Sequence, residues 1–190
     1  MQDVNVLIAF CSDFGWAERL ALAAGLGAVQ GRANIRFRQI KTAEDKARVD
    51  ASRAPGTEDY IAPREVDVEW ADALIWGAPA HLDPSSEEWT EYFHLLGALR
   101  SRGKLEGKLG AAFSAEQKDA GNDSTVVSLC GAMAHLGLMV VLLGELNPNC
   151  PLSEAAALEN VRLQGRRVAE IARALKKANR PAPESAVAAS

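Results

Sequence analysis

Short apolar blocks along the chain are separated by longer blocks in which apolar residues recur at helical spacing. The short blocks have strand length and are rich in aliphatic and aromatic residues; they are residues 4–10, 34–40, 71–76, 109–113 and 138–143. The longer blocks are predicted to be helices; they are residues 17–30, 87–99, 125–136 and 153–177. The pattern therefore predicts strands that alternate with helices.

Alternating buried strands and helices are typical of a parallel sheet that carries helices on both faces. Right-handed crossovers restrict such a chain to doubly wound topologies, in which ligands bind beyond the carboxyl ends of the strands. Four predicted loops meet at that edge, namely 11–16, 77–85, 114–124 and 143–151. We therefore expect the function of the chain to lie in these loops.

Three further segments complete the predicted organisation. Residues 34–40 alternate apolar and polar side chains, as a half-exposed edge strand does. Residues 41–69 are polar and contain two prolines, so an irregular connection is expected, with a helical turn near 43–51. One domain is predicted over residues 1–179, and the tail 180–190, rich in Ala, Pro and Ser, is predicted to be disordered.

The composition narrows the class of protein. The chain has 190 residues and is 48% hydrophobic, but no run approaches the roughly 18 uncharged apolar residues of a membrane span. A net charge of −4 argues against general binding of nucleic acid. No basic segment precedes the first apolar block, so no signal peptide is expected. Cys11, Cys130 and Cys150 have no metal-binding spacing and indicate reduced thiols in a cytoplasmic protein without a metal site.

The first predicted loop has the features of an anion site. A strand that enters a helix through a tight polar turn leaves several backbone N–H groups unpaired at the positive end of the helix dipole. Ser12 adds a hydroxyl donor to this turn. The alternative is that Ser12 or Asp13 only caps the helix.

Other nucleotide-binding motifs are excluded. The chain contains no Gly-x-x-x-x-Gly-Lys-Ser/Thr, so a P-loop is ruled out. Gly25-Leu26-Gly27 falls inside a predicted helix, where close packing explains it better than a dinucleotide fingerprint. A response-regulator receiver would need an aspartate at the end of the third strand, which here ends in Trp76-Gly77.

Four segments together resemble the flavodoxin-like WrbA family of NAD(P)H:quinone oxidoreductases. They are Ser12-x-Phe14-Gly15-Trp16-x-Glu18-x-x-Ala21, Ala71-Asp72-Ala73-Leu74-Ile75-Trp76-Gly77-Ala78-Pro79, Gly107-Lys108-Leu109-Gly110-Ala111-Ala112-Phe113-Ser114 and Ala134-His135-Leu136-Gly137-Leu138. They occur in the family's order and spacing over residues 4–143. The resemblance implies a three-layer α/β/α sandwich with a five-stranded parallel sheet of order 2-1-3-4-5. It also implies FMN at the carboxyl edge, NAD(P)H as electron donor, a quinone or similar acceptor, and homodimers that pair into homotetramers.

The resemblance also assigns site residues. The residues expected to bind the cofactor are Ser12, Asp13, Phe14, Gly15, Trp16 and Ala17 around the FMN phosphate, and Pro79, Ala80, His81, Leu82, Ser114, Ala115, Glu116, Gln117, Gly121 and His135 around the flavin ring. Phe14 also stands where the family binds nicotinamide, and Arg100 stands where a family tryptophan faces the substrate. No catalytic residue is named, because the flavin itself carries the hydride chemistry.

The chain departs from the family pattern within these loops. The family's Thr-Arg-Phe is replaced by residues 80–82, and glycines of its flavin loop are replaced by Gln117, Asp119 and Ala120. Asp13 and Glu116 place negative charge where a phosphate and reduced flavin would lie, which opposes binding.

Two hypotheses from different classes follow. The first is an FMN-dependent NAD(P)H:quinone reductase, which the first loop and His135 favour. The second is a flavodoxin-fold protein that has lost FMN and serves as a binding or interaction module, which the altered loops favour. A one-electron flavodoxin carrier is a more distant third. For single residues, a surface position for His81 and a helix-dipole contact for His135 are the plain alternatives.

Overall fold

A computed structural model describes residues 4–11, 15–40, 60–78, 87–114, 124–142 and 153–179 of the chain. Its strands form one parallel sheet of order β2-β1-β3-β4-β5. The strands are β1 (Val4–Phe10), β2 (Ala33–Gln39), β3 (Ala73–Ala78), β4 (Leu109–Ser114) and β5 (Met139–Val140). The predicted fold class and strand order are therefore confirmed, with β2 at one edge of the sheet.

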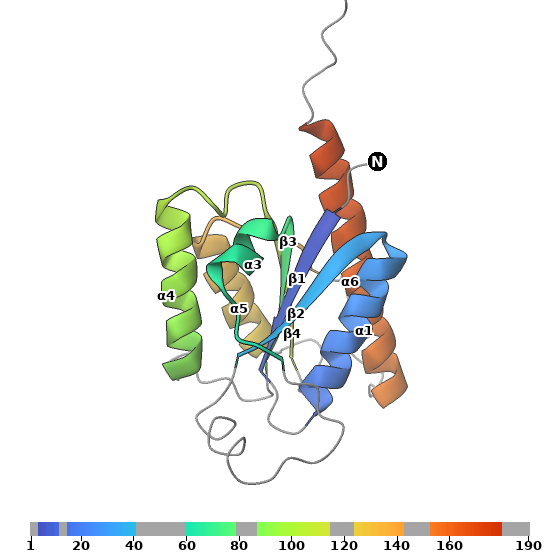
Figure 1. Ribbon diagram of the computed structural model, residues 1–190. Coiled ribbons are helices and arrows are strands. Elements are labelled where there is room, and N and C mark those ends of the chain that lie inside the picture. The colour runs from blue at the N-terminus through green and yellow to red at the C-terminus, as the bar shows by residue number, and fades with distance from the viewer. Residues whose placement is uncertain are drawn as a thin grey trace, which may run out of the picture.

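Helices cover both faces of the sheet (Figure 1). The helices are α1 (Trp16–Gln30), α3 (Glu65–Trp70), α4 (Glu87–Ser101), α5 (Ser124–His135) and α6 (Glu154–Ala178). Helices α1 and α6 lie on one face, on the right of the picture, and α3, α4 and α5 lie on the other. The described part of the chain thus has the three layers of a doubly wound fold.

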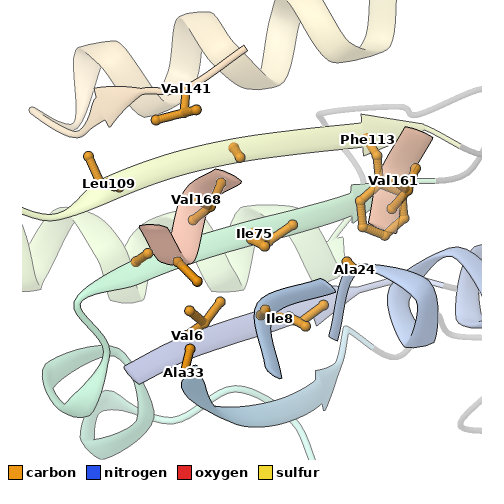
Figure 2. Packing of buried hydrophobic residues seen from close by; sticks show 14 of the residues in the cluster. Val6, Ile8, Ala24, Ala33, Ile75, Leu109, Phe113, Val141, Val161 and Val168 are labelled. Carbon is orange, nitrogen blue, oxygen red and sulfur yellow. The ribbon is translucent and has the colours of Figure 1, made fainter. Parts of the chain in front are cut away.

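Alternate strand residues face the two helical layers and form two cores. Val6, Ile8 and Ile75 pack against α1 and α6, and Figure 2 shows them beside Ala24 of α1 and Val168 of α6. On the opposite face, the buried side chains come mainly from β1, β3, α3, α4 and α5 and include two tryptophans; the largest fully buried ones are Leu7, Leu74, Trp76, Trp89, Leu96, Leu99 and Leu105. The sheet is therefore buried on both sides, which explains the nearly continuous apolar runs of its strands.

Glycines bring α1 into direct backbone contact with its neighbours. A Cβ on Gly27 would overlap the carbonyl oxygen of Arg162, and a Cβ on Gly165 would overlap that of Ala24. A Cβ on Gly25 would collide with the ring of Phe37 in β2. Close packing, as expected from the sequence, accounts for Gly25 and Gly27.

Most element boundaries agree with the sequence patterns within two residues, and two segments differ by more. Residues 65–70 form α3, although the region 41–69 was predicted to be irregular. This helix has only six residues, too few for a helical period to show, and it is held by Val68 in the core and a carboxylate at Asp67. The predicted helical turn at 43–51 and the tail 180–190 lie outside the described residues.

Strand β5 is shorter than the six residues predicted for it. Only Met139 and Val140 pair with β4, and Val141 adds one further hydrogen bond to the carbonyl of Gly110. The next carbonyl on that side of β4, at Ala112, accepts a 3.0 Å hydrogen bond from the amide of buried Gln164 in α6. A side chain of α6 thus takes the place that a longer strand would fill.

Helix α5 allows a simple test of stability. Gly131 lies inside α5, is exposed, and would place a Cβ with no atom within 4 Å. Gly131→Ala is expected to raise the free energy of unfolding by about 1 kcal/mol, since alanine loses less conformational freedom in a helix. Urea unfolding followed by circular dichroism measures the change. Gly110→Ala in β4 should have the opposite sign, because its Cβ would lie 2.8 Å from Sδ of Met133. A Gly131→Ala protein less stable than the parent would contradict an open position.

Candidate functional site

The carboxyl ends of the strands lie at the bottom of Figure 1, where α1 begins. Cys11 follows β1 directly and donates its N–H to the carbonyl of Gly77 at 2.9 Å. Ile40, just beyond β2, donates to the carbonyl of Phe10 at 2.8 Å. These hydrogen bonds align the ends of three neighbouring strands, so the loops that follow them start from one edge.

Helix α1 begins at this edge with a glycine at its N-cap position. Its N-cap residue is Gly15, with φ 77 and ψ −14 in the left-handed region and no side chain to accept a hydrogen bond. Ser12 and Asp13, the capping residues considered from the sequence, lie outside the described residues. The first-turn N–H groups of α1 and the positive end of its dipole point toward the loop edge.

Trp16 provides a second unusual feature at the same helix end. Its indole packs against the core on the α1 side, and the guanidinium of Arg19 lies 5.1 Å from its ring centroid. The indole Nε1 is buried and has no hydrogen-bond partner among the described residues. A buried donor without a partner is costly, but the indole nitrogens of Trp76 and Trp89 share this feature, so Trp16 Nε1 bears on ligand binding only through its place beside the helix N-terminus.

The end of β4 completes the described part of the edge. Ser114 is the last residue of β4, is partly buried and pairs in register with Ala78 of β3. Gly77 leaves room for the ring of Phe113, which would otherwise meet a Cβ. Tyr60 stacks edge-on against Phe10 at 5.1 Å, so aromatic side chains support the edge from the α1 side.

The structure brings four predicted site residues to this edge. Gly15, Trp16 and Ala17 form the start of α1, and Ser114 ends β4. Ala17 is buried, so only its backbone is available to a ligand. Eleven predicted positions lie outside the described residues, namely Ser12, Asp13, Phe14, Pro79, Ala80, His81, Leu82, Ala115, Glu116, Gln117 and Gly121.

Two predicted residues lie elsewhere. Arg100 is in the last turn of α4 and His135 in the last turn of α5. Helix α5 has 12 residues and is therefore ~18 Å long, so His135 lies about that far along the axis from the end that faces the loop edge. Arg100 and His135 do not reach a ligand held by the start of α1 in the same chain. They instead share a pocket between α4 and α5.

That pocket has a volume of about 560 Å³. Its lining residues are Phe93, Gly97, Arg100, Ser101, Ala132, His135 and Leu136. Sequence reasoning missed its α4 side, although Phe93, Gly97, Arg100 and Ser101 recur at helical spacing and so predict a common face. The glycine and alanine in this set are the signal that could have revealed a hollow.

An aromatic cluster lies behind β3, built from the core tryptophans and the apolar side of α4. Trp76, Trp89, Tyr92 and Phe93 lie with ring centroids 5.6–6.3 Å apart. Burial raises the pKa of the Tyr92 phenol far above its ordinary value, so the phenol stays protonated. This cluster fixes the face of α4 that lines the pocket.

The described segments contain no group of three or more His, Cys, Asp or Glu residues able to hold a metal ion. No helix among them is long and apolar enough to cross a lipid bilayer.

Several curated relatives are quinone dehydrogenases. The NAD(P)H dehydrogenase (quinone) of Paracoccus denitrificans is 29% identical over 199 aligned positions, covering 90% of this chain and 95% of the relative. The protein of the same name from Azorhizobium caulinodans is 31% identical over 141 positions, covering 72% of this chain and 69% of the relative. No protein-family model matches the chain.

Solved structures share the fold. The WrbA-like flavodoxin of Agrobacterium tumefaciens has a TM-score of 0.63 at 21% identity, covering 90% of this chain and 99% of that structure. A flavodoxin from Archaea has a TM-score of 0.58 at 17% identity, with coverage of 90% and 99%. The fold, its strand order and the identity to the curated relatives agree, and the chain belongs to the flavodoxin-like, WrbA-related family of NAD(P)H dehydrogenases (quinone).

Proposed function

We propose that the chain is an FMN-dependent oxidoreductase that uses NAD(P)H to reduce quinones or similar acceptors. The observation that carries the proposal is the start of α1, where a left-handed Gly15 stands at the N-cap position and brings the helix N-terminus to the carboxyl edge of the sheet. Curated relatives named as quinone dehydrogenases support it. The reduced thiols of Cys11 and Cys130 fit the cytoplasmic location that belongs to the same proposal.

The residues present fit an FMN phosphate at this edge. The N–H groups of Trp16 and Ala17 would hold the phosphate, and the open space beside Gly15 allows the ligand to approach the backbone closely. The unpartnered Nε1 of Trp16 offers one more donor. Ser114 would lie beside the flavin ring, and the loops 79–82 and 115–121 would line it. When bound, FMN would supply the hydride chemistry, and the chain would position donor and acceptor.

The pocket lined by Arg100 and His135 extends the proposal to the oligomeric state of the protein. Both side chains lie toward the end of their helices remote from the loop edge, so they can contact a cofactor only across an interface with a second copy. We propose a homodimer or homotetramer in which the α4–α5 face of one copy meets the loop edge of another. Sedimentation of the purified protein tests the assembly.

The altered loops support one alternative, a flavodoxin-fold binding module without flavin. Gln117 and Asp119 stand where glycines would let the backbone approach a planar ring, and the carboxylates of Asp13 and Glu116 disfavour an anionic cofactor. Binding of FMN therefore separates the two functions directly.

The test is a visible absorption titration of the purified protein with FMN, followed by NAD(P)H and then a quinone. We expect a shifted flavin spectrum, bleaching by NAD(P)H and recovery with the quinone. Gly15→Val should weaken FMN binding about ten-fold or more, because a β-branched residue disfavours the left-handed conformation at φ 77. Gly15→Asn is the matched control, since Asn tolerates that conformation, and it should bind within a few-fold of the parent.

The FMN titrations of the parent and of Gly15→Val separate the two functions and test the phosphate site. A protein that leaves the spectrum of FMN unchanged would refute the reductase and support the binding module. A Gly15→Val protein that binds FMN as tightly as the parent would show that the phosphate does not lie at the start of α1.

A further inference from the structure

The pocket between α4 and α5, called here the α4–α5 pocket, has the size of a small-molecule site. Its volume of about 560 Å³ lies inside the range common for such sites. Its walls come from two helices, with Phe93, Gly97, Arg100 and Ser101 on α4 facing Ala132, His135 and Leu136 at the end of α5.

The apolar part of the lining is held in place by the core behind it. The ring of Phe93 packs 5.7 Å from Trp76 and 5.6 Å from Trp89, and both tryptophans are buried. Leu136 is only 8% exposed. Gly97 has no side chain, and a Cβ at this position would have no atom within 4 Å, so the space beside it is open. A flat apolar ligand would therefore meet a rigid aromatic and aliphatic surface next to open space.

The lining carries a positively charged side chain and no negatively charged one. Arg100 and His135 are both exposed, and neither has an ion pair or side-chain hydrogen bond with another described residue. No carboxylate is among the lining residues. Arg100 lies in the last turn of α4, where its guanidinium offsets the partial negative charge of the carbonyl end, and His135 lies in the last turn of α5. An anion must compete with that interaction. The planar guanidinium of Arg100 nevertheless presents N–H donors that can bind both oxygens of a carboxylate or sulfonate.

We propose that the α4–α5 pocket binds a planar aromatic anion. The ring system lies against Phe93 and Leu136, in the space left by Gly97, and the acidic group pairs with Arg100, with His135 as a second donor. In one chain this site is separate from the loop edge, so it does not require bound FMN. In the proposed oligomer the same anion would lie near the cofactor of a second copy, where it would be an anionic electron acceptor.

The experiment uses naphthoate and its neutral counterpart naphthamide, which share one bicyclic ring. Isothermal titration calorimetry is carried out on the full-length protein as purified, without added FMN and again with saturating FMN. Naphthoate is expected to bind about ten-fold or more tightly than naphthamide, the effect of one charge-assisted hydrogen-bond pair. Because the first titration needs no flavin, it reports on the pocket whether or not the chain proves to be a reductase.

Variants locate the site. Arg100→Gln should remove the preference for naphthoate, whereas Arg167→Gln should keep it, because Arg167 is an exposed cation on α6 across the sheet. Gly97→Leu should abolish binding of both compounds by filling the pocket, with an unchanged circular dichroism spectrum because its side chain points into open space.

Equal affinities for the two compounds, or no binding of naphthoate at millimolar concentration, would overturn the proposal. So would an Arg100→Gln protein that retains the preference, or a Gly97→Leu protein that binds like the parent.

Discussion

Gly165→Ala is expected to lower the free energy of unfolding by about 3 kcal/mol or more. The added Cβ would overlap the backbone carbonyl of Ala24 in α1, and neither helix backbone can yield as a flexible side chain would. The two helices must move apart, which loosens the packing of Val168 and Ala169 on the sheet. Urea unfolding monitored by circular dichroism gives the change.

The control is Gly131→Ala, the same chemical change inside a helix where nothing opposes the new methyl group. A second variant, Gly27→Ala, affects the other side of the same helix contact and should be similarly destabilised. The double variant should lose less than the sum of the two losses, since one separation of α1 and α6 accommodates both methyl groups. A Gly165→Ala protein as stable as the parent would mean that the helices are not in backbone contact.

Asp67→Asn is expected to produce the second large loss, about 3 kcal/mol at neutral pH. The Asp67 carboxylate is fully buried and accepts hydrogen bonds from Arg38 at 2.6 and 2.8 Å and from Arg36 at 3.2 Å. These contacts join α3 to the edge strand β2, where the Arg36 guanidinium also lies 4.0 Å from the ring centroid of Trp70. An amide in place of the carboxylate leaves the largely buried Arg38 without its counter-charge.

The same carboxylate predicts a pH dependence. Burial raises the pKa of Asp67, but the hydrogen bonds and charge of Arg38 and Arg64 outweigh it and hold that pKa below its ordinary value. Because the folded state favours the ionised form, this stabilisation is present above about pH 4 and is lost as pH falls through the folded pKa. The difference between parent and Asp67→Asn should therefore be constant from about pH 5 to 7 and shrink at lower pH.

Glu65→Gln is the matched control for both measurements. Glu65 pairs with Arg102 on the surface, and both side chains are largely exposed, so its loss should change the unfolding midpoint little. A loss in Asp67→Asn no larger than that in Glu65→Gln would contradict a buried ion-pair cluster.

The alternating pattern carried most of the information on the fold. Strand β1 is a nearly continuous apolar run and helix α6 is strongly periodic, and their predicted limits agree with the structure within one residue. Helix α3 could not be predicted in this way, because its stability comes from Asp67 meeting arginines about thirty residues away in β2. The early end of β5 likewise depends on Gln164, a residue that contacts β4 only in the folded chain.

The candidate site was predictable where local geometry determines it. A strand, a tight turn and a helix in succession predict an anion site, and the structure places the start of that helix, with Gly15 as its N-cap residue, at the carboxyl edge of the sheet. The neighbourhood of Arg100 and His135 was not predictable from spacing, because they are 35 positions apart in the sequence and meet only through the packing of α4 on α5.

The hydrogen bond from Gln164 to Ala112 bears on the order in which the chain folds during synthesis. The carboxyl half of β4 receives its partner from α6, which follows β4 in the chain by about forty residues. The same helix packs against the backbone of α1, which precedes β4. A growing chain therefore leaves part of one face of its sheet uncovered until α6 has been made, and chaperones that hold nascent chains would bind that face.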